Sequence, residues 1–240
     1  MNYYVIRHSL DPKIVGAHQQ VEEAKYTCHV WDDPLFIDRL SFTKIDVEPK
    51  VANAILTKKS KLTDLISAPI IGFNKKLLVS SKLKKILMKY RKTGVQFFRS
   101  GVFRDNIFYE EYWILNMYEI NMDFIDFKKS SFVFRKRKPE GGTYLESVNV
   151  NSYDKFKKIL SKKNELKFTQ FFVDEIRLAD KIDQDFFVLN HVNGGVKYVV
   201  SEKLKQEIEE EGCTGIEFMP IELTLNEWLH NERGKIYGKA

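Results

Sequence analysis

One phrase occurs twice in this sequence. Residues 79–98 and 200–219 align without a gap at an offset of 121 residues, and 8 of the 20 aligned positions are identical. In both copies an apolar run leads to a serine suited to cap a helix, and both copies close on Thr-Gly before another apolar run. Agreement at both ends of the phrase favours internal duplication over chance. The sequence therefore predicts two related strand–helix–strand units.

The helix in each copy is predicted from the spacing of its apolar residues. Leu83 and Leu87 in the first copy, and Leu204 and Ile208 in the second, recur at helical intervals. We expect these four side chains to be buried. The duplication extends upstream more weakly, because residues 64–80 and 185–201 both begin with Asp ahead of two large apolar residues.

The remaining segments predict a mixture of strands and helices. We expect strands at 3–6, 42–48, 109–120, 124–127 and 130–138, and over 168–178 a strand that runs into a turn or short helix. We expect helices beginning at Pro49, over 152–163 and over 224–232, with a loose polar tail after the last. The predicted fold class is α+β, with two related strand–helix–strand halves and a β-rich middle segment. The halves are 1–125 and 126–240, either as two domains or as one fused domain.

Composition indicates a globular chain. Of 240 residues, 43% are apolar and 30% are charged, which argues against disorder. The first residues lack the pattern of a signal peptide, and no apolar stretch approaches the 18 or so residues of a membrane span. Cys28 and Cys213 are the only cysteines, which favours a reducing compartment. We predict a cytoplasmic protein without a membrane partner.

No catalytic or metal-binding motif stands out in the sequence. Sequences of the types HExxH, GxSxG, GxGxxG and GxxxxGK[ST] do not occur. Cys28 and His29 lie near Asp32 and Asp33, but a structural zinc site usually needs four soft ligands in paired spacing. Cys213 follows the second predicted helix, where the helix dipole disfavours a reactive thiolate. We predict no enzyme activity, no metal and no cofactor.

The net charge of +6 is unevenly distributed. The first repeat helix is rich in lysine, whereas the second ends in a run of glutamates. Basic side chains on the first helix and in the run 135–138 are the candidate partner-binding residues: Lys85, Lys89, Lys92, Arg135, Lys136, Arg137 and Lys138. Such a surface would steer an acidic partner. The alternatives are a charged hairpin tip at 135–138, drift on solvated faces, and attraction between the two helices.

The order of these pieces resembles polymorphic-toxin immunity protein family eleven. The resemblance covers most of residues 60–222 and is strongest over 168–219. It rests on "FFVDEIRL", "DFFVLN", "KYVVSEKLKQEIEEEGCTGIEF" and the closing element Gly212–Phe218, with "MNYYVI" and "YWILN" also similar. Residues 8–40 and 223–240 do not match that pattern, and the basic middle segment makes this chain longer than many relatives.

The resemblance implies a non-enzymatic, cytoplasmic bacterial protein that protects the producing cell. Such a protein binds a cognate toxin domain and neutralises it by occlusion, and the family offers no catalytic residues to transfer. The alternative is a basic accessory protein that binds nucleic acid. Steep weakening of nucleic-acid binding with added salt would favour that alternative.

Overall fold

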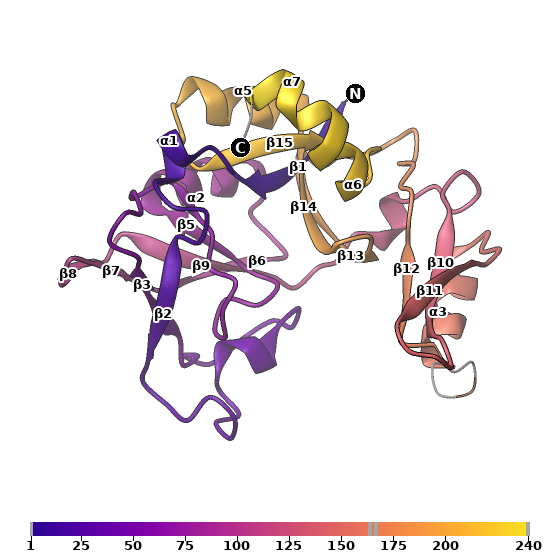
Figure 1. The fold of residues 1–240 in the computed structure, drawn as a ribbon, viewed down its shortest axis with the longest axis horizontal. Helices are drawn as coiled ribbons and strands as arrows, with labels where there is room; N and C mark the ends of the chain where they lie inside the picture. The colour runs from indigo at the N-terminus through magenta and orange to yellow at the C-terminus, as the bar shows by residue number, and fades with distance from the viewer. Residues whose placement is uncertain (1, 163–164, 166–167, 239–240) are drawn as a thin grey trace.

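The computed structural model describes residues 2–162, 165 and 168–238 and shows an α+β fold with three sheets (Figure 1). Fifteen strands are present in the described part of the chain: β1 Tyr3–His8, β2 Val21–Tyr26, β3 Ala52–Leu56, β4 Leu65–Ile66, β5 Leu77–Ser80, β6 Val95–Arg99, β7 Val102–Arg104, β8 Ile107–Tyr109, β9 Tyr112–Met117, β10 Phe132–Arg137, β11 Thr143–Ser147, β12 Gln170–Val173, β13 Phe186–Val192, β14 Gly195–Ser201 and β15 Ile216–Pro220. The helical segments are α1 Pro12–Val15, η1 Ile37–Leu40, α2 Ser81–Tyr90, η2 Met122–Phe124, α3 Tyr153–Ser161, α5 Glu202–Glu210, α6 Leu225–Glu227, the π-helical η3 Trp228–Glu232 and α7 Arg233–Tyr237.

The two predicted strand–helix–strand units are present and share one topology. The first is β5–α2–β6 and the second is β14–α5–β15. In the first, β4 pairs with β5 through Leu65 opposite Val79. In the second, β13 pairs with β14 through Phe186 opposite Val200. Both pairs are antiparallel, and both members of the second pair lie 121 residues beyond those of the first, so the register repeats as well as the sequence.

Both repeat helices begin with the same hydrogen-bonded serine. Ser80 Oγ accepts from Leu83 N and donates to Asp64 Oδ1 at 2.6 Å. Ser201 Oγ accepts from Leu204 N and donates to Asp185 Oδ1 at 2.5 Å. The serine satisfies an otherwise unpaired helix N–H, and the aspartate fixes the orientation of its hydroxyl. The conserved spacing of Asp and Ser in the two copies is thus a helix-capping device.

Each unit is completed by one further strand, and this strand comes from a different place in the chain in the two units. In the first unit β9 lies between β5 and β6, giving the order β4-β5-β9-β6. In the second unit β1 takes that place, giving β13-β14-β1-β15 within a seven-stranded sheet. Tyr112 lies opposite Ser80 and Tyr3 lies opposite Ser201, so the two strands also share their register. The N-terminal strand therefore completes the C-terminal unit.

The division at residue 125 does not separate the sheets, because β1 belongs to the sheet formed by β10–β15. The two alternatives for 1–125 and 126–240, two domains or one fused domain, both stay predictions. The two units also share one core, in which Leu83 and Leu87 of α2 pack in the same apolar cluster as Leu204 and Ile208 of α5. All four are at most 1% exposed, which confirms the helix phase read from the sequence.

Truncation of the shared core is expected to destabilise both units. Leu87→Ala and Ile208→Ala should each lower the free energy of unfolding by roughly 2–5 kcal/mol, because each removes a fully buried side chain. Met88→Ala, at a residue of α2 that is 46% exposed, is the matched control and should cost well under 1 kcal/mol. Urea denaturation measures all three. Equal, small losses for Leu87→Ala and Met88→Ala would contradict the shared core.

Several local predictions were wrong. Residues 42–48 contain no strand, and the helix expected from Pro49 is replaced by β3, which pairs with β2 and β7 in a third sheet of order β2-β3-β7-β8. Residues 42–48 instead form a loop that lies on the first unit. The Ile45 N–H donates to Gln96 Oε1, and Gln96 Nε2 donates to the Ile45 carbonyl. The strand expected at 124–127 is an isolated bridge at Ile125 after η2.

The prediction of a loose tail after residue 232 was also wrong for residues 233–237, which are helical. They continue the final helix as α7, and Arg233 is only 3% exposed. Trp228, which precedes it, is 1% exposed and packs into the core beneath the seven-stranded sheet. The tail therefore covers one face of that sheet (Figure 1).

Candidate partner-binding surface

Strands β10, β11 and β12 and helix α3 form a lobe at one end of the seven-stranded sheet, seen on the right of Figure 1. We call residues 128–173 the basic lobe. They include twelve Lys or Arg and four Asp or Glu, a net charge of +8, whereas the rest of the chain has 27 and 29, a net charge of −2. The excess positive charge of the protein therefore lies entirely in this lobe.

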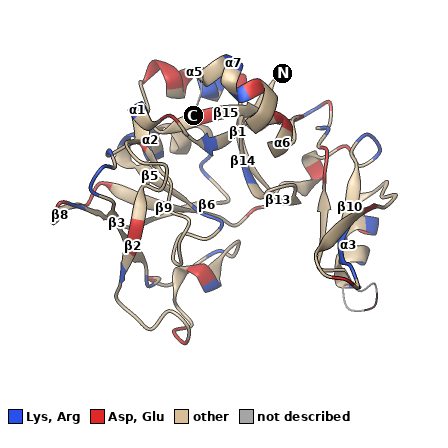
Figure 2. Ribbon diagram, in the orientation of Figure 1, with Lys and Arg blue, Asp and Glu red and all other residues tan. Residues whose placement is uncertain are grey.

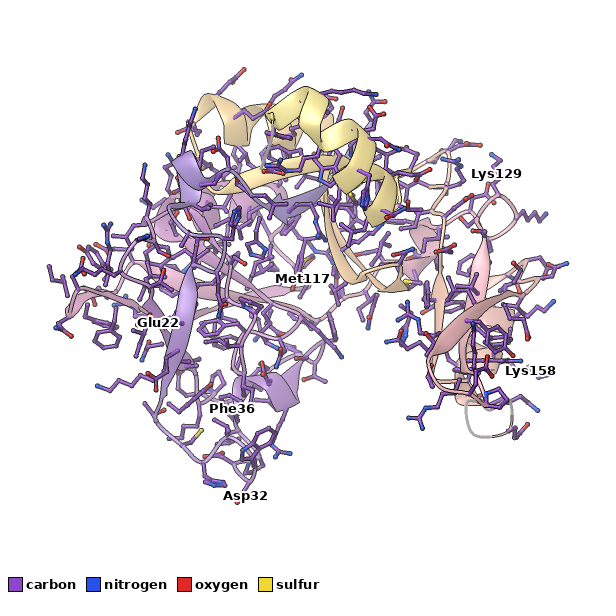
Figure 3. All side chains as sticks on the ribbon, viewed as in Figure 1. Glu22, Asp32, Phe36, Met117, Lys129 and Lys158 are labelled. Atoms are coloured by element: carbon purple, nitrogen blue, oxygen red, sulfur yellow. The ribbon has the colours of Figure 1, made fainter. Side chains whose placement is uncertain are left out.

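Aromatic packing holds α3 on the lobe's sheet. Phe156, the one fully buried side chain of α3, has its ring 4.8 Å from that of Phe171 on β12 and 5.9 Å from that of Phe132 on β10. Ser152 caps the helix by accepting from Lys155 N. Ile159 and Leu160 pack beside Phe156, and the other face of α3 presents lysines to solvent. Figure 3 places Lys158 on α3 and Lys129 at the other end of the lobe.

The run 135–138 occupies the end of β10 and the start of the hairpin to β11. Arg135 Nη1 donates to Gln170 Oε1 at 2.7 Å, and its guanidinium lies 5.4 Å from the Phe172 ring. Lys136 forms an ion pair with Glu146 at 2.8 Å, and this carboxylate raises the pKa of the ammonium. Arg137 and Lys138 are exposed. Two of the four predicted residues are thus held within the lobe, and two are available to a partner.

Strand β11 lies at the edge of the sheet, and all five of its residues are exposed. Tyr144 and Leu145 are 40% and 50% exposed, and Tyr153 at the start of α3 is 38% exposed. The lobe therefore exposes Tyr144 and Tyr153 as well as Arg137, and Tyr and Arg are enriched at protein interfaces. Sequence reasoning chose the basic run but missed this neighbouring strand, because its exposure depends on its place in the sheet.

One of the three candidate lysines on α2 pairs with the second repeat helix. Lys89 Nζ forms an ion pair with Glu207 at 2.9 Å, and Tyr90 donates its hydroxyl hydrogen to the same carboxylate. These bonds lower the pKa of Glu207, the Tyr90 bond having the largest effect. The charge difference between the two helices is therefore explained in part by their mutual attraction, as one sequence-based alternative predicted.

Lys89 keeps 65% of its side chain exposed despite this ion pair, and the other two α2 candidates form no ion pair within the described residues. Lys85 and Lys92 are exposed. Figure 2 shows α2 on the opposite side of the molecule from β10, so the helix and the run 135–138 do not form one surface. Of the two, only the basic lobe combines exposed cations with exposed apolar side chains and an open sheet edge.

Buried charges that sequence reasoning missed join distant segments. Arg91, 6% exposed, donates to Asn121 Oδ1 and Gln184 Oε1 at 2.9 Å each and to the Phe186 carbonyl at 3.1 Å. It thereby links the end of α2 to the start of β13. Arg91 follows an exposed, lysine-rich helix in the sequence, and nothing local distinguishes it from its neighbours.

Lys76 and Lys197 occupy equivalent positions in the two units, 121 residues apart, and both are buried. Burial lowers the pKa of each ammonium to about 8. Lys76 donates to Ser41 Oγ, which ties the loop after η1 to the first unit. Neighbouring Arg7 lowers the pKa of Lys197 further. Burial of a lysine is therefore a shared property of the two copies.

Replacement of Lys197 should produce a pH-dependent gain in stability. Below pH 8 the folded and unfolded chains both keep the proton, so the folded protein bears the full cost of a buried charge. Between pH 8 and 10.5 the unfolded lysine stays protonated while the folded one loses its proton, so wild-type stability rises. Lys197→Met should therefore add up to about 3 kcal/mol at pH 7 and progressively less as the pH rises toward 10.

Denaturant unfolding of wild type and Lys197→Met at pH 7, 8.5 and 10 measures this effect. Lys85→Met, which removes an exposed charge, should change stability by less than about 0.5 kcal/mol at pH 7. A difference between wild type and Lys197→Met that does not shrink with rising pH would contradict the assignment.

The cysteine and histidine candidates show no assembled site. His29 Nδ1 lies 2.8 Å from Asp32 Oδ2, and both side chains are largely exposed. Figure 3 shows Asp32 at the tip of the molecule, far from the basic lobe. Within the described residues, no group of three or more His, Cys, Asp or Glu could hold a metal ion. Burial raises the pKa of Cys213 to about 12, which agrees with its interpretation as a structural thiol.

Comparison with known proteins identifies no relative of this chain. No protein-family model and no curated protein sequence matches the chain. Over the described residues, no helix has the length and apolar character that a membrane crossing requires.

Proposed function

We propose that this protein is a cytoplasmic, non-catalytic immunity protein that binds a cognate bacterial toxin domain and neutralises it by occlusion. The observation that carries the proposal is the basic lobe, a segment of net charge +8 that contains an exposed edge strand with apolar side chains. The resemblance of residues 168–219 to an immunity family supports the same function. Tight occlusion requires such a combination, because charge speeds association and buried apolar contacts slow dissociation.

The partner surface in this proposal is acidic. Arg137 and Lys138 are exposed at the hairpin, and Lys155 and Lys158 are exposed on α3. These cations would raise the association rate with a negatively charged surface, and the gain would diminish as salt screens the charges. The second repeat unit would act as the rigid support of the lobe, because its residues and those of the lobe belong to one apolar cluster.

A growth assay with matched variants tests the proposal. The toxin domain encoded in the neighbouring reading frame is expressed in bacteria together with wild-type protein, Arg137→Glu/Lys138→Glu, or Lys85→Glu/Lys92→Glu. Wild type and the α2 variant should restore growth, and the lobe variant should protect poorly, since reversal of two charges at an interface lowers association rates by about ten- to a hundredfold. No protection by wild type would contradict an immunity function, and equal protection by all three would place the interface elsewhere.

Nucleic-acid binding is the second candidate, because the same +8 lobe would attract phosphates. Binding of an oligonucleotide should then weaken steeply with salt, and the Arg137→Glu/Lys138→Glu variant should show a shallower salt dependence. Strong oligonucleotide binding together with failure to bind the toxin domain would favour this candidate over the first.

A further inference from the structure

Within the described residues, the outer edge of β11 has backbone groups without a hydrogen-bond partner, and their positions follow from the register. Beyond the ends of β11, Val148 N donates to the Phe132 carbonyl at 2.9 Å and Lys138 N donates to the Gly142 carbonyl at 3.2 Å. Because antiparallel pairs alternate between bonded and non-bonded positions, Tyr144 and Glu146 also direct their backbone groups toward β10. Leu145, with Thr143 and Ser147 on either side, directs its N–H and C=O away from the sheet. Within the described residues β11 pairs with β10 alone.

This edge lacks two of the features that commonly prevent pairing, a proline and a bulge. Residues 143–147 contain no proline, and five consecutive pairs join β11 to β10 without a bulge. The opposite edge of the same sheet is different. There β15 ends in Pro220, and Phe218 N donates to the Tyr237 hydroxyl of the C-terminal helix at 2.8 Å. One edge of the sheet is capped by the protein itself, and the other is open.

The side chains beside the open edge indicate what would pair with it. Arg135 lies opposite Leu145 and Arg137 lies opposite Thr143, so both arginines share a face with the outward-directed residues of β11. An added strand would lie one strand spacing beyond β11, and a long arginine can reach toward it across a small threonine. Half-exposed Leu145 offers an apolar contact on that face. A second copy of this edge would bring like charges together, which disfavours self-pairing.

We propose that β11 receives an extended, acidic segment of the partner protein as an additional strand of the sheet. The backbone of Leu145 would supply the central hydrogen bonds, and Arg137 with Lys138 would select acidic side chains. This mode, β-strand addition, obtains affinity from main-chain hydrogen bonds and specificity from side chains on alternate positions. The inference rests on the proposed function for the identity of the partner, but the edge itself can be tested alone.

Peptides of about eight residues serve as the probe, because strands of this length are common. One alternates Glu and Val, and its control alternates Lys and Val. Residue-resolved amide hydrogen exchange by NMR on the full-length protein is the measurement. The Glu–Val peptide should slow exchange of the Leu145 N–H by about tenfold or more at saturation, because this group becomes bonded. The N–H groups of Tyr144 and Glu146, already directed at β10, should change much less.

Two variants separate backbone pairing from charge. Leu145→Pro removes the outward N–H without removing a bond to β10 and should abolish peptide binding. Arg137→Glu/Lys138→Glu leaves the backbone unchanged and should reverse the preference, losing the Glu–Val peptide and gaining the Lys–Val peptide. If Leu145→Pro unfolds the lobe, the peptide preference of Arg137→Glu/Lys138→Glu still tests the proposal. Binding of the Glu–Val peptide without slowed exchange at Leu145 would overturn the inference, as would binding of oligothymidylate but of neither peptide.

The same readout with the toxin domain distinguishes this inference from the proposed function. If the toxin domain binds and Leu145 exchange is unaffected, the proposed function stands and strand addition falls. If the Glu–Val peptide slows Leu145 exchange and the toxin domain does not bind, strand addition stands and the proposed function falls.

Discussion

A chain lacking residues 2–8 is expected not to fold into a stable C-terminal unit. β1 lies between β14 and β15, so its removal leaves backbone groups of both strands unpaired. Tyr3, Val5 and Ile6 are at most 6% exposed and contribute to the cores on both faces of the sheet. Each buried side chain is worth about 1.5–3 kcal/mol, so the loss approaches the 5–15 kcal/mol that stabilises a typical domain.

Circular dichroism and thermal unfolding of the truncated chain measure this loss. Addition of a synthetic peptide with the sequence of residues 2–9 should restore the cooperative transition, because it supplies the missing strand in trans. An unchanged melting transition without the peptide would show that β1 is not part of the second unit's fold, and would contradict the equivalence of β1 and β9.

Arg233→Met is expected to lower the free energy of unfolding by roughly 3–5 kcal/mol, because it leaves a buried carboxylate without its partner. Arg233 Nε and Nη2 donate to the two Glu217 oxygens at 2.8 and 2.7 Å, and the side chains are 4% and 1% exposed. Glu217 Oε1 also accepts from Ser9 Oγ and Leu10 N, so the pair joins the C-terminal helix to the segment after β1.

A matched control lies on the same helix. Lys235→Met removes an ion pair with Glu232 at 2.7 Å, but the two side chains are 68% and 39% exposed. Exposed pairs contribute little, so this change should cost less than about 1 kcal/mol. Urea denaturation compares the two variants directly. Similar small losses for both would mean that the buried pair is not what anchors the C-terminal helix.

The repeat predicted more of the fold than any other feature. Gapless alignment of residues 79–98 with 200–219 gave both helices, their buried faces and their caps, because these depend on local spacing. The same alignment could not reveal that β1 substitutes for β9. "YYVIRH" and "YWILNM" share little beyond their apolar pattern, and their places relative to the repeats are reversed in the chain.

The candidate surface was predicted only in part. Lys89 is in a basic run, but its partner Glu207 is 118 residues away and becomes its neighbour only when the two units pack together. Leu145 and Thr143 sit in a weakly patterned segment, and their free backbone groups follow from the position of β11 in the sheet. Arg233 lies in a polar tail, where nothing in the sequence distinguishes a buried arginine from a solvated one.

In the proposed function, the basic lobe binds an acidic toxin domain. Titration calorimetry of the toxin domain with wild-type protein, Arg137→Glu/Lys138→Glu and Lys85→Glu/Lys92→Glu tests it directly. For wild type and the α2 variant we predict one-to-one binding with a dissociation constant below about 1 μM. For the lobe variant we predict a loss of affinity of about tenfold or more. Absence of binding by wild type, or an equal affinity of the lobe variant, would contradict the claim.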